Sequence, residues 1–167
     1  HVVSSAVFSD LEQHINEQLY VSELDVKDFF YRLGIEDELS DYFALEPVHL
    51  KDLEKVMSTE GHQQLRQELT GPGPFYPCLK VLPMGFSWSF YLAQEAHRYI
   101  AAQALPGTHL AQDGRPLPLL GSPGGIGIIY ADNGTLVGDS CDAVNSRHEA
   151  LKQALEARGL AVHDEQE

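Results

Sequence analysis

One stretch of this sequence decides how the chain folds: Ile128-Ile129-Tyr130-Ala131-Asp132-Asn133-Gly134-Thr135-Leu136-Val137-Gly138. Two short runs of apolar and β-branched residues flank the dipeptide Asn133-Gly134, which predicts a β-hairpin with its turn at that dipeptide. Asn-Gly is the strongest two-residue hairpin signal because both residues tolerate positive φ angles. The hairpin would carry the carboxylate of Asp132 at its tip, where an acidic residue is ordinarily part of the turn itself.

A second acidic strand end lies far upstream, in Leu24-Asp25-Val26-Lys27-Asp28. We expect a strand over residues 20–26 that ends at these carboxylates. If the two acidic strand ends meet in the folded chain, Asp25 and Asp132 would form a site for a divalent cation, because hard cations bind carboxylate oxygens. The aromatic cluster of residues 29–31 follows at once, which places Phe30 beside the carboxylates.

Composition limits the classes of protein to consider. The chain has 167 residues, of which 43% are hydrophobic, and this is enough for one compact core with room for a lobe. Its formal net charge of −14 excludes a free-standing nucleic-acid binder, since such proteins present a basic face. Two cysteines, Cys78 and Cys141, form no disulfide framework, and no Cys/His cluster has the spacing of a zinc site.

The ends of the sequence and its hydropathy bear on where the protein acts. No apolar run approaches membrane-spanning length and no targeting signal is visible, so we expect an intracellular protein of the nucleus or cytoplasm with no membrane partner. The chain starts at His1 without an initiator Met and stops in an acidic tail. We therefore expect a fragment of a larger protein.

Periodicity predicts four helices. A capping box at Ser9-Asp10-Leu11-Glu12 begins a helix over residues 9–19. An apolar stripe after Pro47 indicates a helical segment over residues 47–69. Ser87 would cap a third helix, and residues 143–158 would form a fourth that ends at Gly159. The third helix would pack through a face made of Trp88, Tyr91, Leu92 and Tyr99.

Two further strands and a loop complete the expected elements. Residues 77–82 and 160–163 predict short strands, and the Pro- and Gly-rich residues 105–125 predict a long surface loop. The order of elements indicates an α+β fold, a mixed or antiparallel sheet with helices packed on one face.

Three motifs resemble those of one enzyme family. Leu24-Asp25-Val26-Lys27-Asp28-Phe29-Phe30 resembles the first palm motif of reverse transcriptases. Leu82-Pro83-Met84-Gly85-Phe86 resembles their second motif, and Tyr130-Ala131-Asp132-Asn133 resembles their Tyr-x-Asp-Asp hairpin. The three occur in the family's order, each on the expected element. The resemblance covers residue 20 to the C-terminus and is closest to the retroelement (retrotransposon) branch.

The resemblance implies a domain organisation. Residues 1–19 would be a helical segment at the end of the fingers or the entry to the palm. Residues 20–167 would be the palm-like domain, with a helical insertion at about 46–70 and a loop at about 105–125.

The resemblance also implies a chemistry, RNA-directed DNA synthesis by two-metal nucleotidyl transfer. Two Mg²⁺ or Mn²⁺ ions about 4 Å apart would stabilise the attacking 3′-oxygen and the leaving pyrophosphate. By this resemblance Asp25, Asp132 and Asn133 are the catalytic positions. The metal ligands would be Asp25, Asp132 and a carbonyl near Val26.

The remaining positions implied by the resemblance bind the incoming nucleotide. Backbone amides of Val26, Lys27 and Asp28 would face its triphosphate, and Phe30 would lie under the sugar and select deoxynucleotides. Gly85 would let the chain approach the template–nucleotide pair, with Met84 beside it. The partners would be a dNTP and an RNA or DNA template–primer, bound through the full-length parent because this fragment is too acidic to bind nucleic acid well alone.

Two positions depart from the family pattern. Asn133 stands where the family has a second hairpin Asp, which removes one negative charge; a unit charge at 4 Å is worth about 1 to 4 kcal/mol in a watery or surface environment. Met84 stands where the family usually has Gln, which would cost a hydrogen bond to the nucleotide. Whether the chain is an enzyme therefore stays open at this point.

Two alternatives to an active polymerase palm follow. The first is a degenerate, catalytically inactive reverse-transcriptase-like domain with a structural or protein-interaction role, favoured by Asn133, Met84 and the negative charge. The second is an unrelated ferredoxin-like fold with chance motifs. The histidines, among them His97 and His148, are scattered singly and predict surface or core positions, and Trp88 predicts an anchor of the helix core.

Overall fold

The structure of the chain is a computed structural model, which describes residues 9, 11–12, 18–53, 55, 63, 67, 69, 71 and 73–163. The chain divides into two compact units. The first consists of His1–Leu33 and Met84–Glu167, and the second of Gly34–Pro83.

The first unit contains a five-stranded mixed sheet with the strand order β2-β3-β4-β1-β5. β2 pairs with β3 in parallel, whereas the other neighbours are antiparallel. The α+β class and the mixed sheet predicted from the sequence are therefore confirmed. The strand bounds are β1 Tyr20–Val26, β2 His109–Leu110, β3 Ile126–Tyr130, β4 Asn133–Gly138 and β5 Val162–His163.

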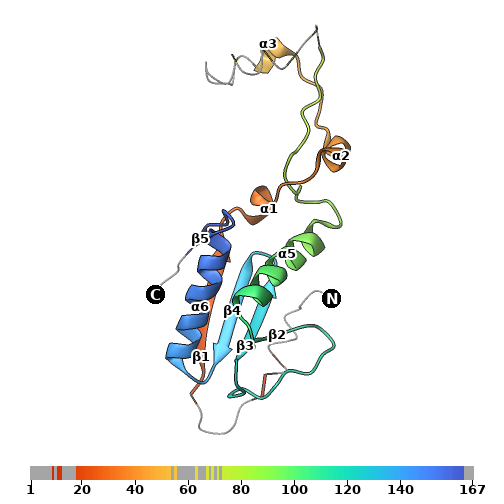
Figure 1. Cartoon of the computed structure of the whole chain (residues 1–167). Coiled ribbons are helices and arrows are strands. Elements are labelled where there is room, and N and C mark those ends of the chain that lie inside the picture. The colour runs from red at the N-terminus through yellow and green to blue at the C-terminus, as the bar shows by residue number, and fades with distance from the viewer. Residues whose placement is uncertain are drawn as a thin grey trace. The chain divides into compact units, whose positions relative to one another are not determined.

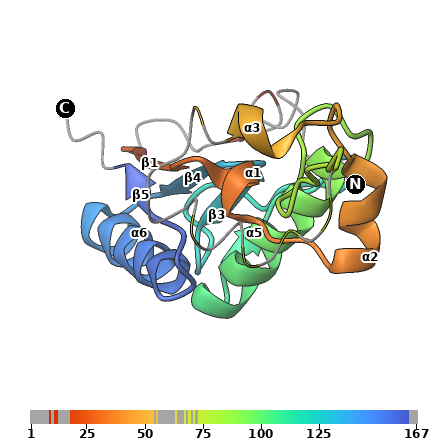
Figure 2. The same ribbon diagram turned by 90° about the horizontal axis from the view of Figure 1, so that it is seen from above.

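Two long helices cover one face of this sheet. They are α5 (Ser89–Ala104) and α6 (Cys141–Glu156), and they lie side by side beneath the strands (Figure 1, Figure 2). α6 contacts β1 and β4, and α5 contacts β3. Ser140 caps α6 by accepting a hydrogen bond from the amide of Ala143 at 3.4 Å. Helices on a single face were predicted and are confirmed, as is the existence of the last helix and of the short strand that follows it.

The packing face of α5 was predicted wrongly. Trp88, Tyr91, Leu92 and Tyr99 are all exposed, with 60%, 42%, 42% and 64% of their surface accessible. The buried face instead carries smaller or polar side chains: Ser89, Ala93, Gln94, His97, Ile100 and Ala101. Small residues let a helix lie close to a sheet, and the bulky aromatic side chains are left on the outer face. Trp88 is the N-cap position of α5, so neither the predicted Ser87 cap nor the predicted Trp88 core anchor is correct.

The long surface loop predicted over residues 105–125 is wrong in part, because this segment contains the strand β2 and the buried residues Ala111 and Leu120. The rest of the segment packs on the opposite face of the sheet. Its residues Ala111 and Leu120 form a buried cluster with Ile126, Ile128 and Val137. Leu11 packs against this cluster, and the amide of Leu120 donates to the carbonyl of Glu12 at 2.9 Å. Leu11 and Glu12 are not helical, so the predicted continuous helix over 9–19 is wrong there; most of its other residues lie outside the described part of the chain.

The second unit is built from short elements. They are α2 (Asp37–Ser40), the 3₁₀ turn η2 (Asp41–Phe43) and α3 (Leu50–Leu53). The predicted strand over 77–82 is wrong as a regular strand, since Cys78 and Val81 make only isolated bridges to Ala44 and Gly34. Pro77 and Pro83, which lack the amide hydrogen, stop the ladder from growing. The predicted helix over 47–69 is present at α3, and most of the rest lies outside the described residues.

No helix in the described ranges combines the length and the apolar character needed to cross a bilayer.

Candidate cation site at the hairpin tip

The hairpin exists, but its turn lies two residues earlier than predicted. Ala131 and Asp132 are the turn residues, and Tyr130 pairs with Asn133 to close the hairpin. Ala131 has a φ of 48°, and a positive φ at the first turn residue alone is the sign pattern of a type II′ turn. Gly134 serves packing instead: a Cβ there would lie 3.1 Å from Cδ1 of Leu24 on the neighbouring strand.

The structure brings the two acidic strand ends together. Asp25 at the end of β1 lies directly opposite Asn133 at the start of β4. The amide of Val26 donates to the carbonyl of Asp132 at 2.9 Å. Directly opposite residues of an antiparallel pair point to the same face, with Cβ atoms about 4.5–5.5 Å apart. Residues more than 100 positions apart in the sequence thus lie at the same end of the sheet, on adjacent strands.

The side chain of Asp25 lies on the face of the sheet opposite the two long helices. Side chains alternate along a strand, so Asp25, Asn133 and Tyr130 share the face of Ile128, on which the 105–125 loop packs. Asp25 and Asp132 are both half-buried. Tyr130 is 48% exposed and its ring meets Phe90 of α5 edge to face, with centroids 5.2 Å apart. An aromatic side chain therefore lies next to the acidic pair.

Asn133 interacts with Asp132 directly. Its Nδ2 donates to Oδ1 of Asp132 at 3.0 Å. This hydrogen bond fixes the amide at the tip and uses one lone pair of the carboxylate. An Asp at position 133 could not donate it, so the departure from the family pattern changes the contacts of Asp132 as well as the charge.

The segment after Asp25 holds the other predicted positions of the first motif. Val26 is 2% exposed and its amide donates to the carbonyl of Asp132, so the predicted contact of this amide with a triphosphate is wrong for the structure as it stands. The amide of Lys27 donates to the carbonyl of Ala161 at 2.9 Å, so two of the three amides predicted to face a triphosphate, those of Val26 and Lys27, are engaged within the sheet. Asp28 has a φ of 53° and begins the short helix α1 (Phe29–Arg32). Phe30 is half-buried against Phe29.

The second motif lies just before α5 and spans the boundary between the units: Leu82 and Pro83 belong to the second unit, and Met84 onward to the first. Met84 is 66% exposed. Gly85 has a φ of 100°, and nothing lies within 4 Å of the point where a Cβ would be. Glycine is needed there for its backbone conformation, and the space around it is open.

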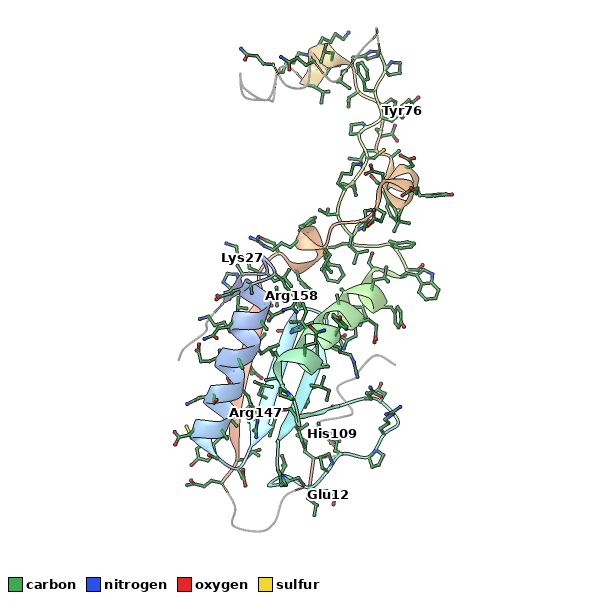
Figure 3. All side chains as sticks on the ribbon, in the orientation of Figure 1. Glu12, Lys27, Tyr76, His109, Arg147 and Arg158 are labelled. Carbon is green, nitrogen blue, oxygen red and sulfur yellow. The ribbon has the colours of Figure 1, made fainter. Side chains whose placement is uncertain are left out.

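One position of this end of the sheet was missed in the sequence: His163 of β5 lies directly opposite Asp25 on the side away from Asn133. The three residues Asn133, Asp25 and His163 therefore form a row across three adjacent strands. Figure 3 shows Lys27 at this β5 end of the sheet, away from Arg147. The pairing of β1 with β5 was the missing information, because two-residue strands leave almost no periodic signal.

Two buried polar residues of α5 contact the hairpin turn, and neither was predicted from the sequence. Gln94 Nε2 donates to the carbonyl of Ile129 at 2.6 Å, and Gln94 Oε1 accepts from the amide of Ala131 at 2.8 Å. His97 Nδ1 lies 2.8 Å from the carbonyl of Ala131. Both side chains are 0% exposed. The available signal was their i, i+3 spacing, which placed two polar residues on one helix face.

His97 is held in its neutral form. Burial lowers the pKa of His97, while the hydrogen bond to the Ala131 carbonyl and the negative charge of Asp132 act in the opposite direction. Since a carbonyl only accepts, the proton of the neutral ring lies on Nδ1. Nε2 is buried and has no hydrogen-bond partner among the described residues. The ring packs edge-on against Phe29, with centroids 5.7 Å apart.

The donor set at the tip fits a hard divalent cation. Asp25 and Asp132 offer carboxylate oxygens and Asn133 an amide oxygen, which are the ligands preferred by Mg²⁺ and Mn²⁺. No group of three or more His, Cys, Asp or Glu side chains within the described ranges is arranged to hold a metal ion. Any cation here would therefore rely on two carboxylates, the amide, backbone carbonyls and water.

Comparison with known proteins adds no relative to this picture. The chain matches no family model, and no curated protein is significantly similar to it.

Proposed function

We propose that this chain is the palm-like part of a template-directed DNA polymerase of the reverse-transcriptase type. The observation that carries the proposal is the pairing of Asp25 with Asn133, together with the hydrogen bond from Val26 to the Asp132 carbonyl. It supports a shared cation site built from the first and third motifs. Two-metal nucleotidyl transfer needs acidic residues from distant segments to meet at one place, as they do at this end of the sheet.

Each residue at the tip would have a defined task. Asp25 and Asp132 would hold Mg²⁺ or Mn²⁺, which when bound supplies charge stabilisation for the attacking and leaving oxygens. The half-buried ring of Phe30 would border the sugar site and exclude a ribose 2′-hydroxyl. Gly85, with open space above its backbone, would allow a base pair to approach the chain closely. The substrates would be a dNTP and a template–primer, bound with the help of the parent protein.

Binding of Mn²⁺ to the chain, followed by the loss of the free-ion EPR signal, tests the site. We expect Asp25→Asn and Asp132→Asn each to weaken binding strongly, since each removes one of two carboxylates. Asp139→Asn is the matched control, because it removes the same charge from an exposed residue just beyond the other end of β4. Equal affinities in all four chains would overturn the shared site.

Substitution at position 133 gives the opposite effect. Asn133→Asp adds a carboxylate beside Asp132, and a unit charge at about 4 Å is worth about 1 to 4 kcal/mol. We expect at least a fivefold gain in Mn²⁺ affinity, since about 1.4 kcal/mol corresponds to a factor of ten. An unchanged affinity would mean that the side chain at 133 does not face the ion.

A second candidate function is a degenerate palm with a structural or protein-interaction role. The hydrogen bond from Asn133 Nδ2 to Asp132 Oδ1 favours it, because the amide occupies a carboxylate oxygen that a cation would need. Primer extension by the longer protein, compared with its Asp132→Ala variant, separates the two candidates. Synthesis that depends on Asp132 supports the polymerase, and cation binding without synthesis supports the degenerate palm.

A further inference from the structure

We infer that Gln94 and His97 are positioning residues that hold the Ala131-Asp132 turn so that the carboxylate of Asp132 faces Asp25. The role of the Asp132 carboxylate as a cation ligand rests on the proposed function. The support that Gln94 and His97 give to the turn does not depend on that function. Neither residue would touch the cation or a substrate. Both act through the backbone of the turn.

The turn requires such support because Ala131 adopts an unfavourable conformation. Its φ of 48° lies in the left-handed region, which residues with a Cβ rarely occupy. Asp28 is the other non-glycine residue with positive φ in the described ranges, and it lies three residues after Asp25. Strained backbone of this kind persists only where the surroundings fix it, and it gathers at functional sites.

The hydrogen bonds of α5 meet this need from beneath the hairpin. Gln94 accepts from the Ala131 amide and His97 contacts the Ala131 carbonyl, so both peptide groups that flank Ala131 are fixed. The second peptide group leads directly into Asp132. Gln94 also donates to Ile129, which ties the end of β3 to the same helix.

An ordinary core position would not carry these side chains. Buried polar groups are costly unless they are hydrogen-bonded, and an apolar side chain would pack on the sheet without that cost. His97 is buried although its Nε2 has no hydrogen-bond partner among the described residues. The contact of Nδ1 with the Ala131 carbonyl is therefore the interaction that offsets the cost of burying this side chain. Its ring also packs on Phe29, four residues after Asp25. One helix therefore braces both acidic segments.

Three substitutions test the inference. Gln94→Met removes both hydrogen bonds at similar length, and His97→Phe keeps the ring but removes Nδ1. His97→Asn keeps an amide nitrogen near the place of Nδ1 and should restore part of the contact. Ile100→Val is the matched control, since it trims a buried residue of α5 whose apolar side chain cannot hydrogen-bond to the turn.

The measurements are the Mn²⁺ affinity of each chain by EPR and the hydrogen-exchange rate of the Ala131 amide by NMR. Loss of a partner that orients a metal ligand typically weakens metal affinity about 10- to 100-fold. We expect losses of that size for Gln94→Met and His97→Phe, a smaller loss for His97→Asn, and none for Ile100→Val. Exchange at Ala131 should be faster in the first two variants.

The outcomes separate this inference from the proposed function. If the unaltered chain binds Mn²⁺ and both Gln94→Met and His97→Phe bind it equally well, the positioning role is overturned. If the unaltered chain binds no Mn²⁺, the proposed function fails, and the Ala131 exchange rate alone decides whether the two residues hold the turn. Should Gln94→Met fail to fold, the comparison of His97→Phe with His97→Asn decides the same question.

Discussion

The two ends of the sheet deal with difficult backbone in different ways. At the end that carries Arg147 (Figure 3), tight places are occupied by glycine: a Cβ on Gly124 would lie 2.0 Å from the carbonyl oxygen of Gly107, and one on Gly125 would lie 2.6 Å from Nη1 of Arg147. At the hairpin tip, by contrast, the positive φ falls on Ala131, and buried side chains of α5 hold it. At the Arg147 end, glycine is used because a Cβ would clash with neighbouring atoms. At the hairpin tip, Ala131 is held by hydrogen bonds, which fixes the orientation of the following residue, Asp132.

The largest effect that tests this contrast is expected at the glycine end. Gly124→Ala would force backbone apart as well as strain its φ of 95°, so we expect a loss of stability of about 3 kcal/mol or more. Gly107→Ala is the control, because its φ of 86° is similar but nothing lies within 4 Å. It should cost about 1–2 kcal/mol, the price of the left-handed conformation alone. Urea unfolding measures both, and equal costs would show that the close approach is not limiting.

A smaller effect is expected at the tip, where alanine can be replaced by glycine. Ala131→Gly loses a buried methyl group and adds chain entropy but relieves the left-handed conformation, so we expect a stability within about 0.5 kcal/mol of the original chain. Ala101→Gly, in the interior of α5, gains no such relief and should cost about 2 kcal/mol through helix propensity and lost burial. Unfolding in urea compares the two. A loss at Ala131 as large as that at Ala101 would argue against strain at the turn.

The smallest effect concerns pH and depends on His97. Burial lowers the pKa of His97 below the ordinary 6.5. Between the folded-state pKa and pH 6.5, the unfolded chain therefore binds more protons than the folded chain. The contribution of neutral His97 to the free energy of unfolding is complete above pH 6.5, and it is lost as the pH falls through the folded-state pKa. We expect the original chain to lose more stability between pH 7 and pH 5 than His97→Phe does, measured by urea unfolding at each pH. Parallel pH profiles would contradict a neutral, buried His97.

The sequence predicted the parts of the fold that depend on local pattern. The hairpin, the helix predicted over 143–158 and the strand over 20–26 follow from periodicity and turn residues. The predicted turn at Asn133-Gly134 was wrong because Gly134 is required by the close approach of Leu24, a residue of another strand. The local signal was correct for a hairpin, and a long-range contact shifted its position.

The candidate site shows the same division. Asp25 and Asp132 were identified from motifs, and the sheet places their strand ends together. The bracing residues Gln94 and His97 were missed because a helix pattern does not reveal which face meets the sheet. The aromatic residues Trp88 and Tyr99 were taken for that face and are exposed instead. Large size and apolar character indicate burial only on average.

The position of β1 in the sheet has a consequence for how the chain is made. β1 comes from residues 20–26, yet both of its neighbours, β4 and β5, follow more than 100 residues later. During synthesis both edges of β1 stay unpaired until the segments that form β4 and β5 have been synthesised. Pairings over such separations slow folding and leave apolar strand edges open to aggregation. We therefore expect ribosome-bound chains that end before residue 133 to need chaperones. The sheet should form only after the segments of β4 and β5 have left the ribosome.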